Sequence, residues 1–284
     1  MISIIKSFLL LIGFSSFLFA QVKDFSFDDS QNPWPSIRKE RIEKLLPLAM
    51  KEAGIDSWIV ICRENDNDPL AIHVGGENAG GTAAFLFFLQ GDKVHSVAIS
   101  PSGEARALKD VGLQNEVIEI ERGSSVWSEV KKLIEKYNPS KIAINSSERN
   151  LSDGLSYTVR VEMEKELGAD ISAKFVSSDP IVVNWLSVKL PSEIEIMRKA
   201  GLLTVQIQTE AYKTVIPAKT TDADVARYIK KRMKEFGVED AWQPDQNPNV
   251  NSGVDRGHSH STDKVIQPGD IIQIDHGIKV YGVW

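Results

Sequence analysis

Cysteine is nearly absent from this chain of 284 residues, in which Cys62 is the only one. A single thiol cannot form an internal disulfide, so we expect a fold without covalent cross-links. A large excess of one charge is also missing, because 33 Lys and Arg residues stand against 39 Asp and Glu residues. This balance provides no strongly basic surface for nucleic acid or for an anionic membrane, and we expect neither partner.

Long apolar runs are missing too, except for one near the N-terminus. Residues 8–19 are mostly apolar, follow Lys6 and precede Ala20. A basic residue, a short apolar stretch and a small residue are typical of a secretory signal peptide. The run is shorter than the roughly 20 residues that cross a bilayer. We therefore predict a signal peptide over residues 1–20, no stable membrane span and an exported protein, periplasmic or secreted; an uncleaved anchor is the alternative.

The rest of the composition is that of a folded globular protein. Hydrophobic residues make up 42% of the chain and charged residues 25%, which excludes a largely disordered or collagen-like chain. At about 100–200 residues per domain, the length predicts two domains.

The first domain is predicted over residues 37–176, where short apolar runs alternate with helical patterns. Runs rich in β-branched and aromatic residues indicate strands, and apolar residues at helical spacing indicate helices. Pro47 should bend or shorten the first helix. The strands are expected at 57–62, 83–89, 94–99, 117–120 and 141–144, and the helices at 37–53 and 126–137. Such alternation is typical of an α/β domain.

A second domain is predicted over residues 187–284, after a boundary near 177–190. A short helix is expected at 180–188, and a longer one begins at Pro191 and stops before Pro217. Thr221 should cap a further helix that ends at Gly237. Strands are expected at 265–266, 271–275 and 279–283, which gives an order of helices followed by a sheet.

The segment from Gly269 to Gly277 contains the first candidate site residue. If it is a strand, Ile272 and Ile274 lie on one face, and Gln273 and Asp275 lie on the other. A carboxylate held on a strand is a rigid ligand for a divalent cation. Asp-His-Gly at the end of a strand is also a common way to begin a turn, so Asp275 alone does not decide between the two interpretations.

Two histidines nearby, His258 and His260, have the spacing that places both rings on one face of a strand. Such a pair can chelate zinc or copper. Without a third ligand nearby, a hydrogen-bonded or solvated pair in a loop is the simpler interpretation.

Other motifs indicate no chemistry. Gly75-Gly76 and Gly80-Gly81 enclose a glycine-rich segment that lacks the residues of a phosphate-binding loop, and we interpret it as a flexible connection. There is no Gly-x-Ser-x-Gly motif, and Cys62 lies in an apolar strand where a thiol is normally inert. Serine or cysteine nucleophiles therefore have no support.

Taken together, residues 187–284 resemble the creatinase/aminopeptidase P/prolidase family of pita-bread metallopeptidases. Six short motifs and His258 follow one another in the order of that family, which makes the resemblance specific. The motifs lie at 188–200, 215–226, 249–253, 264–266, 269–270 and 274–277. Residues 37–176 resemble, in their layout, the α/β domain that precedes the catalytic domain in creatinases and Xaa-Pro peptidases.

The resemblance implies an α/β fold, with a creatinase-type N-terminal domain followed by the first half of a pita-bread α+β domain. It implies a metal-dependent exopeptidase that hydrolyses X-Pro bonds in peptides with proline at the second position. Asp275 matches the first carboxylate ligand of a site for two divalent ions, Mn²⁺, Co²⁺ or Zn²⁺. His258 matches a histidine that contacts substrate and helps to move a proton, and His260 is the second choice. A homodimer is expected by analogy.

The sequence also departs from the family. The other four ligands, an Asp, a His and two Glu, have no counterpart up to Trp284, so we expect a C-terminally truncated fragment that is inactive as written. A prolidase-like dipeptidase and a non-catalytic creatinase-fold binding protein remain the alternatives to an Xaa-Pro aminopeptidase.

Overall fold

The computed structural model describes residues 27–65, 67–254 and 259–284. The predicted signal peptide lies outside these residues. The described chain divides into two compact units. The first unit contains residues 29–197 and 281–283, and the second contains residues 27–28, 198–280 and 284. The predicted domain limits, 37–176 and 187–284, stay predictions.

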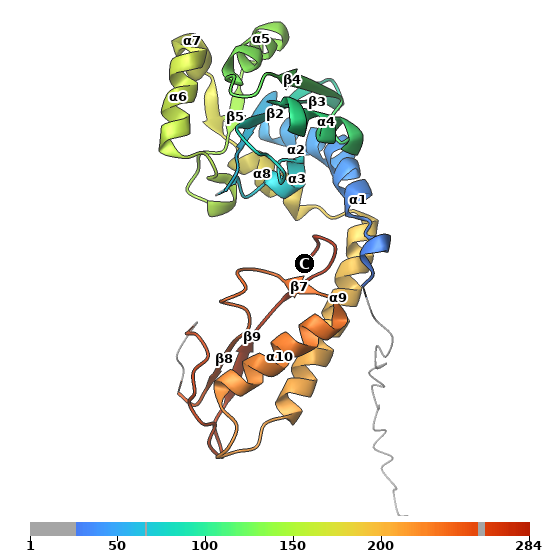
Figure 1. Cartoon of the computed structure of the whole chain (residues 1–284), viewed down its shortest axis with the longest axis vertical. Coiled ribbons are helices and arrows are strands. Elements are labelled where there is room, and N and C mark those ends of the chain that lie inside the picture. Colours follow the sequence, from blue (N-terminus) through green and yellow to red (C-terminus); the bar gives the residue numbers. More distant parts are fainter. Residues whose placement is uncertain (1–26, 66, 255–258) are drawn as a thin grey trace, which may run out of the picture. The chain divides into compact units, whose positions relative to one another are not determined.

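A six-stranded mixed sheet forms the centre of the first unit, in the order β4-β3-β2-β1-β5-β6 (Figure 1). Strand β2 pairs antiparallel with β1 and with β3, and the remaining neighbours are parallel. The strands are β1 (Ser57–Cys62), β2 (Ala83–Gln90), β3 (Lys93–Pro101), β4 (Glu116–Ile120), β5 (Ile142–Ile144) and β6 (Phe175–Ser177). All five predicted strands of this domain are therefore confirmed, as is its α/β class.

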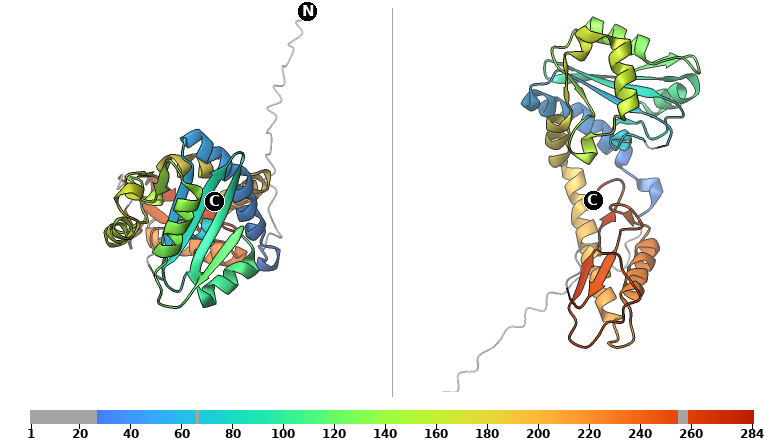
Figure 2. Two further views of the ribbon diagram at one scale, coloured as in Figure 1. Left: turned by 90° about the horizontal axis from the view of Figure 1, so that it is seen from above. Right: turned by 90° about the vertical axis from the view of Figure 1, so that its left-hand side faces the viewer.

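Helices cover both faces of this sheet, which Figure 2 shows from two further directions. One face packs against helices that include α2 (Leu46–Ala53), α3 (Ala71–Val74) and α8 (Asp179–Ser187). The other packs against α5 (Trp127–Tyr137), α6 (Tyr157–Leu167) and α7 (Ala169–Ser172). Residues of β1 alternate between the two cores, because successive side chains of a strand point to opposite faces.

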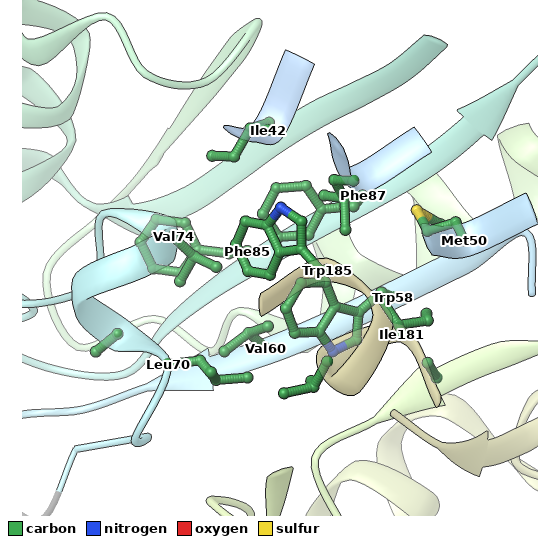
Figure 3. Packing of buried hydrophobic residues seen from close by; sticks show 14 of the residues in the cluster. Ile42, Met50, Trp58, Val60, Leu70, Val74, Phe85, Phe87, Ile181 and Trp185 are labelled. Carbon is green, nitrogen blue, oxygen red and sulfur yellow. The ribbon is translucent and has the colours of Figure 1, made fainter. Parts of the chain in front are cut away.

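The first of these cores contains an aromatic cluster, shown in Figure 3. The ring of Trp58 stacks on Phe87 at 5.2 Å and meets the edge of Trp185 at 5.7 Å. The indole nitrogen of Trp58 donates to Oδ1 of Asn145 at 2.8 Å, so its buried polar atom has a partner. These contacts fix helix α8 on the sheet.

The predicted helix at 37–53 is interrupted. It consists of α1 (Trp34–Glu40), a π-helical turn η2 (Arg41–Leu45) and α2, with Pro47 in the first turn of α2. Proline has no N–H to donate and crowds the preceding turn, which accounts for the irregular hydrogen bonding just before it. Gly54, with a φ of 62°, ends α2 in the left-handed conformation.

The second unit is built on two helices and short strand pairs. Helix α9 (Pro191–Lys213) starts in the first unit, and its residues from 198 onward belong to the second. Helix α10 (Asp222–Phe236) begins with the predicted cap at Thr221 and ends at Gly237. Strand β8 (Asn249–Ser252) pairs antiparallel with β9 (Ile272–Asp275), and β7 (Glu239–Asp240) pairs with β10 (Ile278–Lys279).

Two of the predicted strands do not form as predicted. Residues 265–266 make only an isolated bridge between Val265 and Thr221. Residues 279–283 do not continue as a strand, because Tyr281 and Gly282 adopt positive φ angles of 51° and 74° and form a turn. The helices that the structure describes include none that is long and apolar enough to cross a membrane.

Candidate active-site pocket

Asp275 stands at the end of the antiparallel pair of β8 and β9. Its partner in the register is Asn249, and Val250 is paired with Ile274. Strand β8 is buried along its whole length, and Val250 is fully inaccessible. Asp275 is half-buried, while Gln273 on the same side of β9 is exposed. The paired strands thus give Asp275 the rigid position that the sequence predicted.

A pocket of about 420 Å³ opens beside this carboxylate. It is lined by Trp242, Gln246, Asn249, His260 and Asp275. The Oδ1 atom of Asn249 is buried and accepts no hydrogen bond from the described residues. The pocket therefore combines a carboxylate, an imidazole, two amides and an indole around space for a small ligand.

The structure brings His260, the second-choice histidine, to the wall of this pocket, whereas His258 lies outside the described residues. The segment that follows residue 258 is bonded to β8. Asn251 Nδ2 donates to the carbonyl of Ser259 at 2.9 Å, and the Ser259 hydroxyl donates to Asn251 Oδ1 at 2.8 Å. The backbone N–H of Val250 donates to the Ser261 hydroxyl at 2.8 Å. These bonds on either side of His260 hold it near Asp275.

Asn247 fixes the chain on the far side of Asp275. Its Nδ2 donates to Asp240 Oδ1 at 2.8 Å and to the carbonyl of Gly277 at 2.7 Å, and its Oδ1 accepts from the Gly277 N–H at 3.0 Å. Gly277 lies close to Trp242, since a Cβ added there would stand 2.7 Å from the indole ring. A shift of the turn at Gly277 would therefore also displace Trp242 in the pocket wall.

His276 is a partly buried histidine that the sequence interpretation did not single out. Burial lowers its pKa below the usual 6.5, although the nearby Asp275 charge and a hydrogen bond with the Thr204 backbone act in the opposite direction. Its Nε2 atom is buried and has no hydrogen-bond partner within the described ranges. The ring is therefore neutral at pH 7 and offers one unused nitrogen.

The described residues do not complete a metal centre. Within them, no group of three or more His, Cys, Asp and Glu side chains is placed to hold a metal ion. Asp275 fits a single carboxylate ligand, but a dinuclear site needs several charged donors to compete with water. The ligand set implied by the resemblance is thus not met by the described residues alone.

Cys62 is excluded as a nucleophile by its surroundings. The side chain is fully buried in β1, and burial, together with the charges of Asp68 and Glu77, raises the pKa of its thiol far above the usual value. The reactive form of cysteine is the thiolate, which this environment suppresses. The surroundings of Cys62 are therefore consistent with the inert thiol that the sequence predicted.

Residues 195–284 match the model of metallopeptidase family M24. No curated protein matches the chain by sequence. The Xaa-Pro dipeptidase from Bacillus anthracis is similar in structure, with a TM-score of 0.62 and 18% identity over 87% of this chain and 62% of that one. The X-Pro aminopeptidase from Thermotoga maritima has a TM-score of 0.58 and 22% identity, with 82% and 61% covered.

The prolidase from Pyrococcus horikoshii is a third similar structure, with a TM-score of 0.57 and 19% identity over 86% of this chain and 61% of that one. The chain thus spans a little over three fifths of the length of these solved structures. The predicted fold and resemblance are confirmed: residues 195–284 match the model of metallopeptidase family M24, and the chain has the fold of Xaa-Pro dipeptidases, X-Pro aminopeptidases and prolidases.

Proposed function

We propose that this chain belongs to a metal-dependent exopeptidase that hydrolyses X-Pro bonds, of the Xaa-Pro aminopeptidase type. The observation that carries the proposal is the position of Asp275, which lies on a paired strand at a polar pocket inside the segment matched to family M24. Asp275 would be one carboxylate ligand of the metal site. Bound divalent ions would supply the activation of water that such hydrolysis requires.

The other residues of the pocket suit a peptide substrate. Trp242 is 39% exposed and offers an apolar ring face against which a proline side chain can pack. Asn249 has a buried oxygen without a partner, which can accept a hydrogen bond from a backbone or terminal N–H of the substrate. We assign proton transfer and substrate contact to His258, with His260 as the alternative because it lines the pocket.

The test combines metal content with cleavage. The 284-residue chain, and the longest protein encoded by the reading frame that contains it, should be assayed with Mn²⁺, Co²⁺ or Zn²⁺ on a tripeptide with proline at the second position. We expect metal-dependent release of the N-terminal residue only from a protein that supplies the remaining metal ligands, and not from the 284-residue chain. Asp275→Asn should abolish that release. Asp263→Asn, an exposed carboxylate outside the pocket, is the matched control.

Two results would favour the alternatives. Cleavage restricted to X-Pro dipeptides would assign a prolidase-like dipeptidase. Binding of proline peptides without cleavage, unaffected by metal and by Asp275→Asn, would assign a non-catalytic binding protein and overturn the peptidase. We also propose that residues 1–20 direct export and that the protein forms a homodimer. These two proposals are tested by locating the N-terminus of the mature protein and by sedimentation.

A further inference from the structure

A second cavity lies in the first unit, and none of the chemistry above uses it. Its volume is about 260 Å³, and its wall comes from α1, from the segment after α3, from β2 and β3, and from α4 (Ser102–Val111). The glycine-rich segment from Gly75 to Gly81, which the sequence suggested to be a simple connection, contributes part of the wall. All of these residues belong to one unit, so the cavity does not depend on any other part of the chain.

Most of this wall is apolar. Phe85 and Ala83 from β2 and Leu108 from α4 are buried residues of this wall. The volume is close to the lower end of the roughly 300–1,000 Å³ usual for ligand pockets. At about 30 Å³ for each water-sized group, the cavity holds a molecule of roughly nine non-hydrogen atoms. The apolar part of such a ligand would pack on these side chains.

Two oxygen atoms in the wall have no hydrogen-bond partner among the described residues, in addition to Nε of the ion-paired Arg38. Ser100, at the end of β3, is 1% exposed, and its hydroxyl forms no hydrogen bond within the described residues. In Glu104, which lies in the first turn of α4, the Oε2 atom is buried and likewise has no partner there. Buried polar atoms without partners cost free energy, so both groups are suited to bind a ligand that donates hydrogen bonds.

The charges of the wall determine whether the cavity favours a cationic or an anionic ligand. Arg38 is already paired with Glu77 at 2.5 Å and also donates to the carbonyl of Ile72 at 3.1 Å. Glu104 is left as the carboxylate without a cationic partner among the described residues, so the cavity carries one net negative charge. An anion is disfavoured, although the cavity lies at the start of a helix, because Glu104 already occupies that position.

We propose that this cavity is a binding site for a small organic monoamine, whose ammonium group binds Glu104 and Ser100 and whose apolar body packs on Phe85 and Leu108. The ammonium group provides the donors that both oxygens lack, and its charge balances that of Glu104. This inference is independent of the proposed peptidase activity, since it uses no residue of the pocket around Asp275.

The first experiment compares two ligands of one shape. Phenethylamine and 2-phenylethanol, each of about nine non-hydrogen atoms, differ in carrying an ammonium or a hydroxyl group. They are titrated into the full 284-residue chain by calorimetry at pH 7. We expect the amine to bind about tenfold more tightly, as for one charge-assisted hydrogen bond. Equal affinity, or no binding of the amine at millimolar concentration, overturns the proposal.

Variants of the carboxylate test its role. Glu104→Gln should abolish the preference for the amine while 2-phenylethanol still binds, and Glu121→Gln, an exposed carboxylate outside the cavity, should change neither. Gly80→Ala keeps the charge but places a Cβ 2.3 Å from Oε1 of Glu104, so the carboxylate must move and the preference should fall. Gly81→Ala is the matched control, because its Cβ meets only Pro101 at an ordinary 3.7 Å.

A blocking variant tests the location. Ala107 is an exposed residue of α4 that lines the cavity, so Ala107→Phe can fill the space without disturbing a buried position. It should remove the binding of both ligands, whereas Asp110→Phe, on the same helix and outside the cavity, should not. Thermal melts followed by circular dichroism confirm that each variant folds. Unchanged binding in folded Ala107→Phe would place the amine elsewhere and overturn the proposal.

Discussion

Asn249 lies directly opposite Asp275 in the antiparallel pair of β8 and β9, and both side chains line the same pocket. The strand that carries Asn249 is buried, whereas β9 is partly exposed. The position of Asp275 therefore depends on β8 on one side and on the turn at Gly277 on the other.

Gly277→Ala should destabilise the second unit and displace the pocket wall. A Cβ at this position would stand 2.7 Å from the ring of Trp242 and 2.9 Å from Cβ of Ala241, so the indole or the turn must shift. Overpacking of this kind costs about 1–3 kcal/mol. Urea unfolding and the emission of the tryptophans should report the change.

Gly201→Ala is the control for that substitution. Gly201 lies inside α9, and an added Cβ meets nothing within 4 Å. Alanine in place of glycine in a helix stabilises by roughly 0.5–1 kcal/mol. If the two substitutions changed the free energy of unfolding in the same direction, the contact between Gly277 and Trp242 would not have the importance that we assign to it.

The sequence predicted those elements whose signals are local. The cap at Thr221, the left-handed end at Gly237 and the hairpin of β2 and β3 each depend on neighbouring residues, and each is present. Helices α4 and α6 were not anticipated, since each buries only two side chains and has a narrow apolar stripe. Their existence depends on the sheet against which they pack.

The site was predictable only in part, for the same reason. Asp275 could be placed at the end of a strand from alternation alone. Trp242 and Asn249 could not be linked to it, because their approach requires the pairing of β8 with β9 and the hydrogen bonds of Asn247. The turn at Gly282, which replaces the predicted strand, fits closely against Trp34, a contact between residues far apart in sequence.

Glu193→Gln should destabilise the first unit strongly. Its carboxylate accepts from Arg41 at 2.6 Å, and both side chains are almost wholly buried. Arg41 also donates to the carbonyls of Val188 and Trp185, so its guanidinium group stays buried when the ion pair is lost. Removing one charge of a buried pair costs about 3–5 kcal/mol. Chemical unfolding of the variant measures this loss.

The exposed pair Lys132–Glu129 is the comparison for that experiment. The Lys132 side chain is 67% exposed, and the two groups are 2.6 Å apart. A pair of this kind contributes about 0–1 kcal/mol. Glu129→Gln should therefore leave the unfolding midpoint nearly unchanged. A loss as large as that of Glu193→Gln would show that burial is not what distinguishes the two pairs.

His73→Phe should make the first unit less sensitive to acid. Burial, with smaller effects of Arg41, Lys189 and Arg38, lowers the pKa of His73 from 6.5 to about 3. Below pH 6.5 the unfolded chain takes up a proton that the folded chain does not, so stability falls as the pH falls. At pH 5 the loss relative to pH 7.5 is about 2 kcal/mol.

Phenylalanine suits this site, because the ring of His73 already meets the edges of Trp34 and Trp185 at 5.5 and 5.9 Å. Urea unfolding of the wild type and of His73→Phe at pH 7.5 and pH 5 gives the comparison. Between these two values the variant should lose less stability than the wild type. An identical loss in both proteins would show that another group is responsible for the acid sensitivity.

The capping box of α10 should also show a pH dependence, at a lower pH. The Thr221 hydroxyl accepts from the Asp224 N–H, and the Asp224 carboxylate accepts from the Thr221 N–H at 2.9 Å. The hydrogen bond from the Thr221 backbone, followed by that from Arg227, lowers the pKa of Asp224 from 3.8 to about 2. A carboxylate with a lowered pKa stabilises the folded state at a pH above 3.8, and this contribution is lost as the pH falls towards 2.

Thr221→Ala should cost about 1 kcal/mol at pH 7, the usual effect of losing an N-terminal cap. Asp224→Asn should be less stable than the wild type at pH 7, and the difference should shrink between pH 4 and pH 2 as the wild-type carboxylate becomes protonated. Thermal unfolding across this range measures both effects. A difference that stays constant down to pH 2 would mean that the charge of Asp224 contributes nothing to the cap, and that the hydrogen bonds of Thr221 alone begin the helix.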